Sequence, residues 1–303
     1  MESVIQTKGL TKAYGQMKAI DQVNIRVQKG DIYGLIGKNG AGKSTLMKTI
    51  CGLTKQTAGE IELFESNQLK EERKRIGCMI EQPALYPDMT ARDNLIYYNK
   101  LMGIEGKSNV DEILELVGLG GTQKKKTKQF SLGMKQRLSI AIALLGSPDL
   151  LILDEPINGL DPTGIKEIRE LILQLNQERN ITILISSHIL GELSKVANRY
   201  GVIESGKMVA EFTKEELEQR CQSCVQLIVD DVKKASYVLS DLIMSREYKV
   251  VDDKTIYVYD HLDEKKEINE KMILNGVSVE EINLVGQDLE AYFMELMGGA
   301  EHV

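Results

Sequence analysis

The chain has 303 residues, of which 42% are hydrophobic and 27% charged, a composition typical of a soluble globular protein with one large and one small domain. Its net charge of −7 argues against a protein that mainly coats nucleic acid. Four cysteines in a chain of this length do not indicate a disulfide framework, and no apolar run approaches the roughly 18 residues that span a bilayer. The N-terminus lacks the pattern of a signal peptide, so we expect a cytoplasmic protein that reaches a membrane only through another chain.

Residues 1–213 are predicted to form an α/β domain. The segments SVIQTKGLTKAY, IDQVNIRVQKGDIYGLIG, GEIELF and RIGCMIEQ predict strands, and a helix is expected from Ser44 to about Ile50. A mostly helical subdomain is expected over about 86–147, because apolar residues there recur at a spacing near 3.6. LLILDEP and ITILISSH are apolar runs that end in polar residues, a pattern typical of a buried parallel sheet, and an amphipathic helix is predicted between them.

Residues 214–303 are predicted to form a smaller α+β domain. The segments from CVQLIVDD to DLEAYFMELM predict the order β-α-β-β-α-β-α, which is close to a ferredoxin-like arrangement. No catalytic constellation is found in this part of the sequence.

The stretch GKNGAGKS, residues 37–44, matches the phosphate-binding pattern G-x-x-x-x-G-K-[ST] between a predicted strand and a predicted helix. Glycines let the backbone aim successive N–H groups at an anion, and the helix adds its positive N-terminal end. Lys43 is then expected to reach the β- and γ-phosphates of ATP, and the Ser44 hydroxyl to bind Mg²⁺. The predicted cradle comprises Gly37, Asn39, Gly40, Ala41, Gly42, Lys43, Ser44 and Thr45.

Two carboxylates follow the apolar strand LLIL, at the strand end where ligands bind in α/β folds. Asp154 suits Mg²⁺, directly or through water, and Glu155 suits the polarisation of an attacking water. The alternative is a strand-end turn with two solvated acids.

The segment QFSLGMKQRLSIAIALLGSPDLLILDEPINGLDP resembles the signature-to-D-loop region of ABC ATPases. The signature stands as Phe130-Ser131-Leu132-Gly133-Met134, where the common family form is LSGGQ, so two positions depart from the pattern. Ser131 and Gly133 are retained, and by this resemblance they touch a γ-phosphate. Ser131 would also make an ordinary helix cap.

The resemblance extends to three further positions. Tyr14 stands where the family stacks an aromatic ring on adenine, with an ordinary core or surface tyrosine as the alternative. His188 matches the switch histidine, with a satisfied strand-end histidine as the alternative, and Asp161 matches the D-loop.

The family's Q-loop usually has glutamine two residues before proline, whereas here Glu81 holds that position before Pro83 and Gln82 follows it. Either Glu81 or Gln82 serves as the loop residue. An E-loop together with FSLGMKQR resembles the ATPase subunits of bacitracin-type exporters and lantibiotic self-protection transporters.

The resemblance implies an ATPase that uses ATP and Mg²⁺, with Glu155, His188 and Lys43 as catalytic residues and with Ser44, Asp154 and Glu81 near the metal. It implies a head-to-tail homodimer or pseudo-dimer, in which Ser131 and Gly133 of one copy complete the other copy's site. Integral membrane permease subunits would hold the protein at the inner face of the membrane, for export of a peptide antibiotic, lantibiotic or similar amphipathic compound. The alternatives are a soluble ABC ATPase acting on ribosomes or DNA, and an ABC subunit for another substrate, import included; no nucleic-acid partner is expected.

Overall fold

The structure is a computed structural model that describes residues 2–81, 85–104, 109–221, 223–285, 292–293 and 296. Gln82 and Pro83 lie outside these residues, as does most of the helix predicted over 288–297. The chain divides into two compact units, with main spans Met1–Lys214 and Glu215–Gly299.

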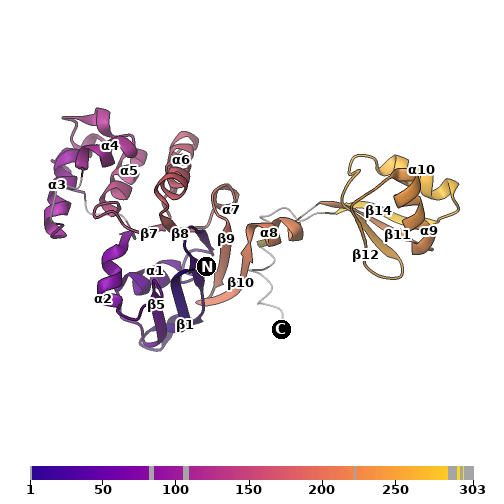
Figure 1. Cartoon of the computed structure of the whole chain (residues 1–303), viewed down its shortest axis with the longest axis horizontal. Helices are drawn as coiled ribbons and strands as arrows, with labels where there is room; N and C mark the ends of the chain where they lie inside the picture. Colours follow the sequence, from indigo (N-terminus) through magenta and orange to yellow (C-terminus); the bar gives the residue numbers. More distant parts are fainter. Residues whose placement is uncertain are drawn as a thin grey trace. The chain divides into compact units, whose positions relative to one another are not determined.

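The first unit contains a four-stranded antiparallel sheet built around one long strand (Figure 1). Its strands are β1 (Ser3–Tyr14), β2 (Met17–Val23), β3 (Arg26–Gln28) and β5 (Ala58–Leu63). β1 pairs with each of the other three, because its twelve residues are long enough to change partner along their length. This sheet carries the β1–β2 turn to the edge of the candidate site described below.

The second sheet of this unit has six strands in the order β10-β9-β4-β8-β7-β6. They are β4 (Ile32–Ile36), β6 (Ile76–Met79), β7 (Leu150–Asp154), β8 (Thr182–Ser187), β9 (Arg199–Glu204) and β10 (Lys207–Thr213). All neighbours pair in parallel except the hairpin of β9 and β10, and every residue of β4, β7 and β8 is buried. The predicted buried parallel sheet is therefore confirmed, whereas β9 and β10 were not predicted.

The helices of the first unit are α1 (Lys43–Cys51), α2 (Leu69–Glu72), α3 (Ala91–Leu101), α4 (Val110–Leu116), α5 (Leu132–Ala143), α6 (Pro162–Arg179) and α7 (Leu190–Leu193). Of these helices, α3, α4, α5 and α6 begin at a residue whose side chain caps the helix. Thr90 and Asp93 form a capping box on α3, and Ser131 caps α5. In Figure 1, α3, α4 and α5 lie together at one end of this unit, apart from β1 and β5, and they form the expected helical subdomain.

The core of the first unit joins both sheets through α1. Leu46, Met47 and Ile50 of this helix are fully buried in one apolar cluster, together with side chains from β1, β4 and β7. Burial of this helix face fixes the loop that precedes α1 relative to the ends of the parallel strands.

The second unit has one four-stranded antiparallel sheet in the order β12-β13-β11-β14, preceded by α8. Its elements are α8 (Lys214–Cys221), β11 (Cys224–Val229), α9 (Val232–Tyr237), which continues as a π-helical segment η4 (Val238–Ile243), β12 (Tyr248–Val250), β13 (Thr255–Val258), α10 (Lys265–Leu274) and β14 (Val279–Val285). The chain order and the strand order are those of a ferredoxin-like fold, and both helices bury apolar side chains in its core. The predicted fold of this unit is confirmed.

Candidate functional site

The glycine-rich loop joins β4 to α1, and its shape requires glycine. Gly42 caps α1 with a φ of 111°, and a Cβ atom at this position would lie 2.6 Å from the carbonyl oxygen of Ala19. At Gly37 a Cβ atom would lie 2.4 Å from the carbonyl oxygen of Ile203. No side chain caps α1, so its first N–H groups point into the loop without a partner in the helix and are available to an anion.

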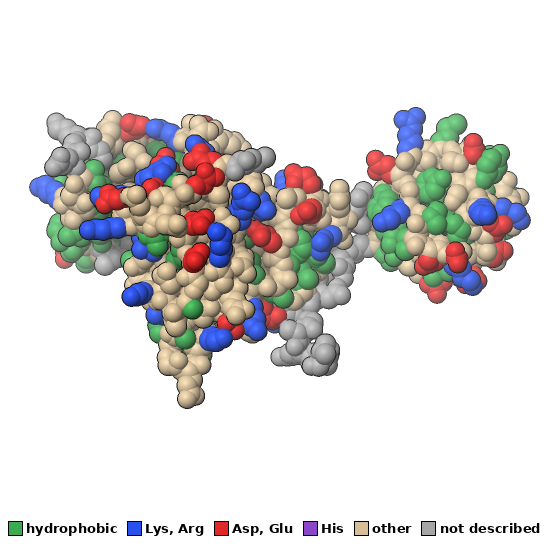
Figure 2. All heavy atoms as spheres, turned by 60° about the horizontal axis from the view of Figure 1, so that its bottom comes forward, with side chains coloured by type: hydrophobic (Ala, Val, Ile, Leu, Met, Phe, Trp, Pro, Cys, Tyr) green, Lys and Arg blue, Asp and Glu red, His purple; other side chains and the backbone are tan. Residues whose placement is uncertain are grey.

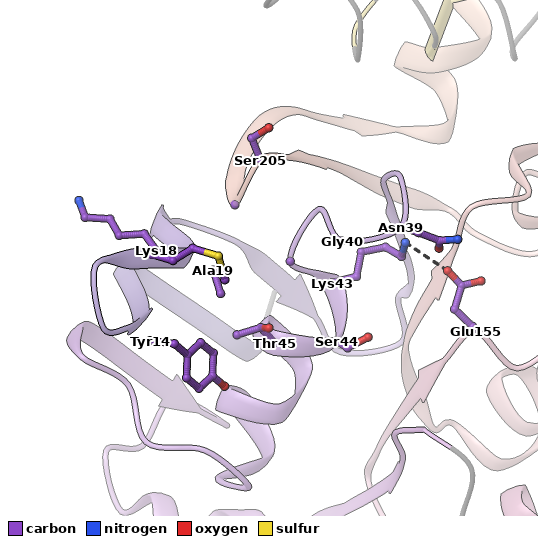
Figure 3. A pocket seen from close by; sticks show the side chains of 13 residues that line it. Tyr14, Lys18, Ala19, Asn39, Gly40, Lys43, Ser44, Thr45, Glu155 and Ser205 are labelled. Atoms are coloured by element: carbon purple, nitrogen blue, oxygen red, sulfur yellow. Dashed lines mark ion pairs between the residues drawn. The ribbon is translucent and has the colours of Figure 1, made fainter.

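Lys43 is only 5% exposed, and its ammonium group is held over this loop. The Nζ atom donates to the carbonyl oxygens of Gly37, at 2.6 Å, and Lys38, at 3.2 Å. It also lies 3.2 Å from Oε1 of Glu155, which comes from the end of β7 (Figure 3). The positive charge therefore stands between the loop and the end of β7, and a phosphate group would compete with Glu155 for it.

A pocket of about 480 Å³ opens beside this loop. The lining residues are Tyr14, Met17, Lys18, Ala19, Asn39, Gly40, Gly42, Lys43, Ser44, Thr45, Glu155, Ser205 and Gly206. Eight of these were predicted site residues. Of the five others, three are the first residues of β2 and two form the turn between β9 and β10. Neither segment carries a motif, so only the folded chain reveals them.

Tyr14 stands at the outer rim of the pocket and is 50% exposed. The ammonium group of Lys12 lies 4.8 Å from the centre of its ring, a cation–π contact. An exposed ring at the rim is free on one face to stack on a planar ligand.

The two carboxylates at the end of β7 are held by β8. Asp154 is 8% exposed, and its Oδ1 accepts a hydrogen bond of 2.6 Å from the hydroxyl of Ser186, which in turn accepts one of 2.9 Å from the backbone N–H of Glu155. Glu155 has a φ of 48°, and its Oε2 lies 2.8 Å from Nδ1 of His188. Glu155 thus lies between a lysine and a histidine, an arrangement that can orient a general base.

Ser186 was not predicted as a site residue. Its only signal in the sequence is its place in the polar ending of the strand ITILISSH.

Ser131 caps α5 and Asp161 caps α6, and neither residue lines the pocket. The Ser131 hydroxyl accepts from the backbone N–H of Met134 at 3.2 Å, and the Asp161 carboxylate accepts from that of Gly164, also at 3.2 Å. The starts of α5 and α6 lie close together. Leu132 is the first residue of α5 and Gly159 lies just before α6, and a Cβ atom added at Gly159 would be 3.3 Å from the Leu132 side chain. Among the described residues that line the pocket, neither Ser131 nor Gly133 nor Asp161 appears.

Glu81 lies beyond the end of β6 with a φ of 61°, and its carboxylate forms an ion pair with Lys48 of α1. Glu81 is thus held at α1 in this conformation and does not line the pocket. The structure does not describe Gln82, so the choice between the two loop residues stays a prediction.

The donor atoms present fit a magnesium ion that keeps several other ligands. Within the described ranges, no group of three His, Cys, Asp or Glu side chains could hold a metal alone. Ser44 and Asp154 offer oxygen atoms, and Mg²⁺ usually takes only one or two protein oxygens beside water and phosphate.

Comparisons with known proteins agree with this arrangement. Residues 20–158 match the family model described as "ABC transporter". The chain is 45% identical over 302 residues to the bacitracin transport ATP-binding protein BcrA of Bacillus licheniformis, covering 99% of each chain. It is 46% identical over 209 residues to the lantibiotic transport ATP-binding protein SrtF of Streptococcus pyogenes, covering 69% of this chain and 90% of that one.

Solved structures show the same fold. The dimeric ATP-binding cassette MJ0796, in a post-hydrolysis state with ADP and Pi, superposes with a TM-score of 0.63 at 26% identity, covering 70% of this chain and 99% of that one. The ADP conformation of the cassette MJ1267 gives a TM-score of 0.64 at 28% identity, covering 73% and 95%. The resemblance to bacitracin and lantibiotic transport ATPases, predicted from the signature and the E-loop, is confirmed. With its phosphate-binding loop, its strand-end carboxylates and these relatives, the chain belongs to the ABC transporter family as an ATP-binding subunit, and its activity is ATP hydrolysis.

Proposed function

We propose that this chain powers the export of a peptide antibiotic, a lantibiotic or a similar amphipathic compound through separate membrane subunits. The observation that carries the ATPase part is the sequence of contacts from Lys43 through Glu155 to His188 beside the phosphate-binding loop. The transported class is supported by the full-length similarity to a bacitracin transport protein. In the part of the chain that the structure describes, no helix is long and apolar enough to cross a bilayer.

ATP would enter the pocket with its phosphates on the loop and its adenine against Tyr14. Lys43 would exchange its contacts with Glu155 and the loop carbonyls for the β- and γ-phosphates. Ser44 and Asp154 would hold Mg²⁺, which neutralises developing charge on the phosphate oxygens. The remaining cradle residues Gly37, Asn39, Gly40, Ala41, Gly42 and Thr45 would bind phosphate through backbone N–H groups or side-chain donors.

Glu155 would accept a proton from the attacking water once Lys43 turns to the phosphates. His188, which lies 2.8 Å from this carboxylate, would hold its orientation and contact the γ-phosphate. Glu81 would have to leave Lys48 to approach the metal, and Gln82 is the alternative residue for this role.

A second copy of the chain would complete the site with Ser131, Gly133 and Asp161. Two observations support this proposal: these residues do not line the pocket of their own chain, and the similar cassette MJ0796 forms a dimer. Binding at the inner face of the cell membrane would then follow from membrane partners.

The second unit would modify the ATPase rather than form part of it. The match to SrtF covers 90% of that relative in only 209 residues, so SrtF has no length for a further domain of this size. Acidic and basic side chains are mixed over the surface seen in Figure 2, and no nucleic-acid role is proposed for either unit.

The export proposal can be tested in the host cell with the chain at its natural expression level. A Lys43→Ala replacement should raise sensitivity to bacitracin, a lantibiotic or linearmycin, while Lys38→Ala, whose side chain lies outside the pocket lining, should not. Unchanged sensitivity to all three compounds would contradict the proposed substrate class. Recovery of RNA or DNA instead of a membrane protein with the purified chain would contradict the transport role.

A further inference from the structure

The short helix α7 directly follows the candidate switch histidine, and its position depends on its side chains. It spans only Leu190–Leu193, and a helix of a single turn is not stable by its own hydrogen bonds in water. His188 precedes this helix by two residues. The contacts that fix α7 on the rest of the unit therefore also fix the backbone from which the His188 ring extends.

One side of α7 is fixed by apolar packing. Leu190 and Leu193 are buried, and a Cβ atom at Gly34 would lie only 2.7 Å from Cδ2 of Leu193. Leu193 thus packs directly against β4, the strand that leads into the phosphate-binding loop. This contact sets the distance of α7 from the sheet.

The side of α7 toward α6 is fixed by an ion pair. Nη1 of Arg169, on α6, donates to Oε2 of Glu192 at 2.9 Å, and the two side chains are only 25% and 21% exposed. Nζ of Lys195 contacts the other oxygen, Oε1, of the same carboxylate. Because much of the surrounding water is excluded, the pair between α6 and α7 is stronger than a fully exposed one.

The ion pair lies at the edge of an apolar contact between the two helices. Arg169 and Glu192 line a void of about 10 Å³, together with apolar side chains that include Ile172 of α6 and Leu193 of α7. The apolar side chains alone do not close this contact, so the ion pair contributes to the fixed distance between α6 and α7.

The chain between the ion pair and the histidine is short and hydrogen-bonded. Glu192 follows His188 by four residues, and the hydroxyl of Ser187 accepts a hydrogen bond of 2.9 Å from the backbone N–H of Ile189. A displacement of α7 would therefore move the backbone of His188. The His188 ring, whose Nδ1 lies 2.8 Å from Oε2 of Glu155, would lose this alignment.

The partner helix α6 begins at the D-loop position. Asp161 caps this helix of 18 residues, and Arg169 follows Asp161 by eight residues, about 12 Å along the axis. The contact of Arg169 with Glu192 thus joins the helix that carries the D-loop residue to the segment that carries His188.

We propose that Arg169 and Glu192 form a positioning pair that holds His188 in place relative to α6. Within the described ranges, neither residue lines the nucleotide pocket, so both act through the histidine rather than on ATP itself. The proposal rests on the proposed role of His188 at the γ-phosphate. A displacement of α6 when a second copy contacts Asp161 would then also move His188.

Steady-state ATP turnover of the full chain with Mg²⁺ tests this pair. Arg169→Met removes the charge and keeps most of the length of the side chain, and Glu192→Gln keeps the shape of its partner. We expect kcat to fall about tenfold in either variant while KM for ATP changes less than about twofold, because the orientation of His188 affects phosphoryl transfer rather than nucleotide binding. Since the contact uses a single donor, Arg169→Lys should recover most of the turnover. The matched control Lys166→Met removes an exposed ion pair with Glu170 on the same helix and should keep its turnover.

A His188→Ala background separates positioning from a general loss of structure, with release of radiolabelled phosphate keeping slow variants measurable. In this background, Arg169→Met should lower turnover by less than about twofold further, because its effect passes through the absent ring. A second tenfold loss there would overturn the proposal.

Urea unfolding shows which variants fold, and Glu192→Gln repeats the test if Arg169→Met does not. Full turnover of a folded Arg169→Met beside a slow His188→Ala would overturn the role of the pair alone. Full turnover of His188→Ala would instead count against the proposed role of the histidine, so the two failures are distinguishable.

Discussion

Replacing Ser186 with alanine should disturb both carboxylates of the site at once. The fully buried hydroxyl donates to Asp154 at 2.6 Å and accepts from the backbone N–H of Glu155 at 2.9 Å. A hydrogen bond to a charged group contributes about 1.5–3 kcal/mol, and a buried N–H left without a partner costs about 1–3 kcal/mol. Because the two effects share one atom and do not add fully, we expect the free energy of unfolding to fall by about 3 kcal/mol.

The same substitution should also lower ATP turnover, because Glu155 holds a φ of 48° that this hydrogen bond helps to fix. Urea unfolding and phosphate release would be measured on Ser186→Ala and on Ser139→Ala. Ser139 is the matched control, since it is also buried but makes a single neutral hydrogen bond, to the carbonyl oxygen of Lys135 at 2.8 Å. The control should lose about 1 kcal/mol and keep its turnover. Equal stability and equal turnover of the two variants would refute the role assigned to Ser186.

Three further results are expected. Gly42→Ala should lose about 2 kcal/mol of stability in urea unfolding and bind no ATP in calorimetry. The reason is that φ at this position is 111° and the new Cβ atom would lie 2.6 Å from the carbonyl oxygen of Ala19. Normal ATP affinity would show that the loop tolerates a side chain. A chain that ends after Lys214 should hydrolyse ATP within about threefold of the full chain, and loss of turnover in a folded truncation would show that the second unit is required. Burial raises the pKa of Glu211, so its contribution to stability is complete below about pH 4 and is lost as the pH rises through the raised pKa. Urea unfolding from pH 4 upward should therefore show wild type losing stability relative to Glu211→Gln, and parallel curves would contradict this.

The parts of the fold that sequence predicted are those with a strong local signal. The buried strands β7 and β8 are continuous apolar runs, and α3, α5 and α6 combine a helical period with a capping residue at the first turn. β9 and β10 were missed because they form a hairpin of mixed polarity whose pairing depends on β4.

The candidate site shows the same division. The phosphate-binding loop was predictable because glycine spacing, a lysine and a following helix act together over eight residues. The contact between Lys48 and Glu81 joins segments 33 residues apart and carries no motif, so only the folded chain brings it into view. Ser186 likewise acts through a neighbouring strand, which sequence spacing alone does not identify.

The central claim is that Glu155 activates the water that attacks ATP, and the turnover of Glu155→Gln tests it most directly. The substitution keeps the shape of the side chain and removes its ability to accept a proton. We predict that phosphate release falls by about 100-fold or more while the affinity for ATP with Mg²⁺ changes little. A variant that binds ATP normally and still releases phosphate at a rate close to wild type would contradict the account.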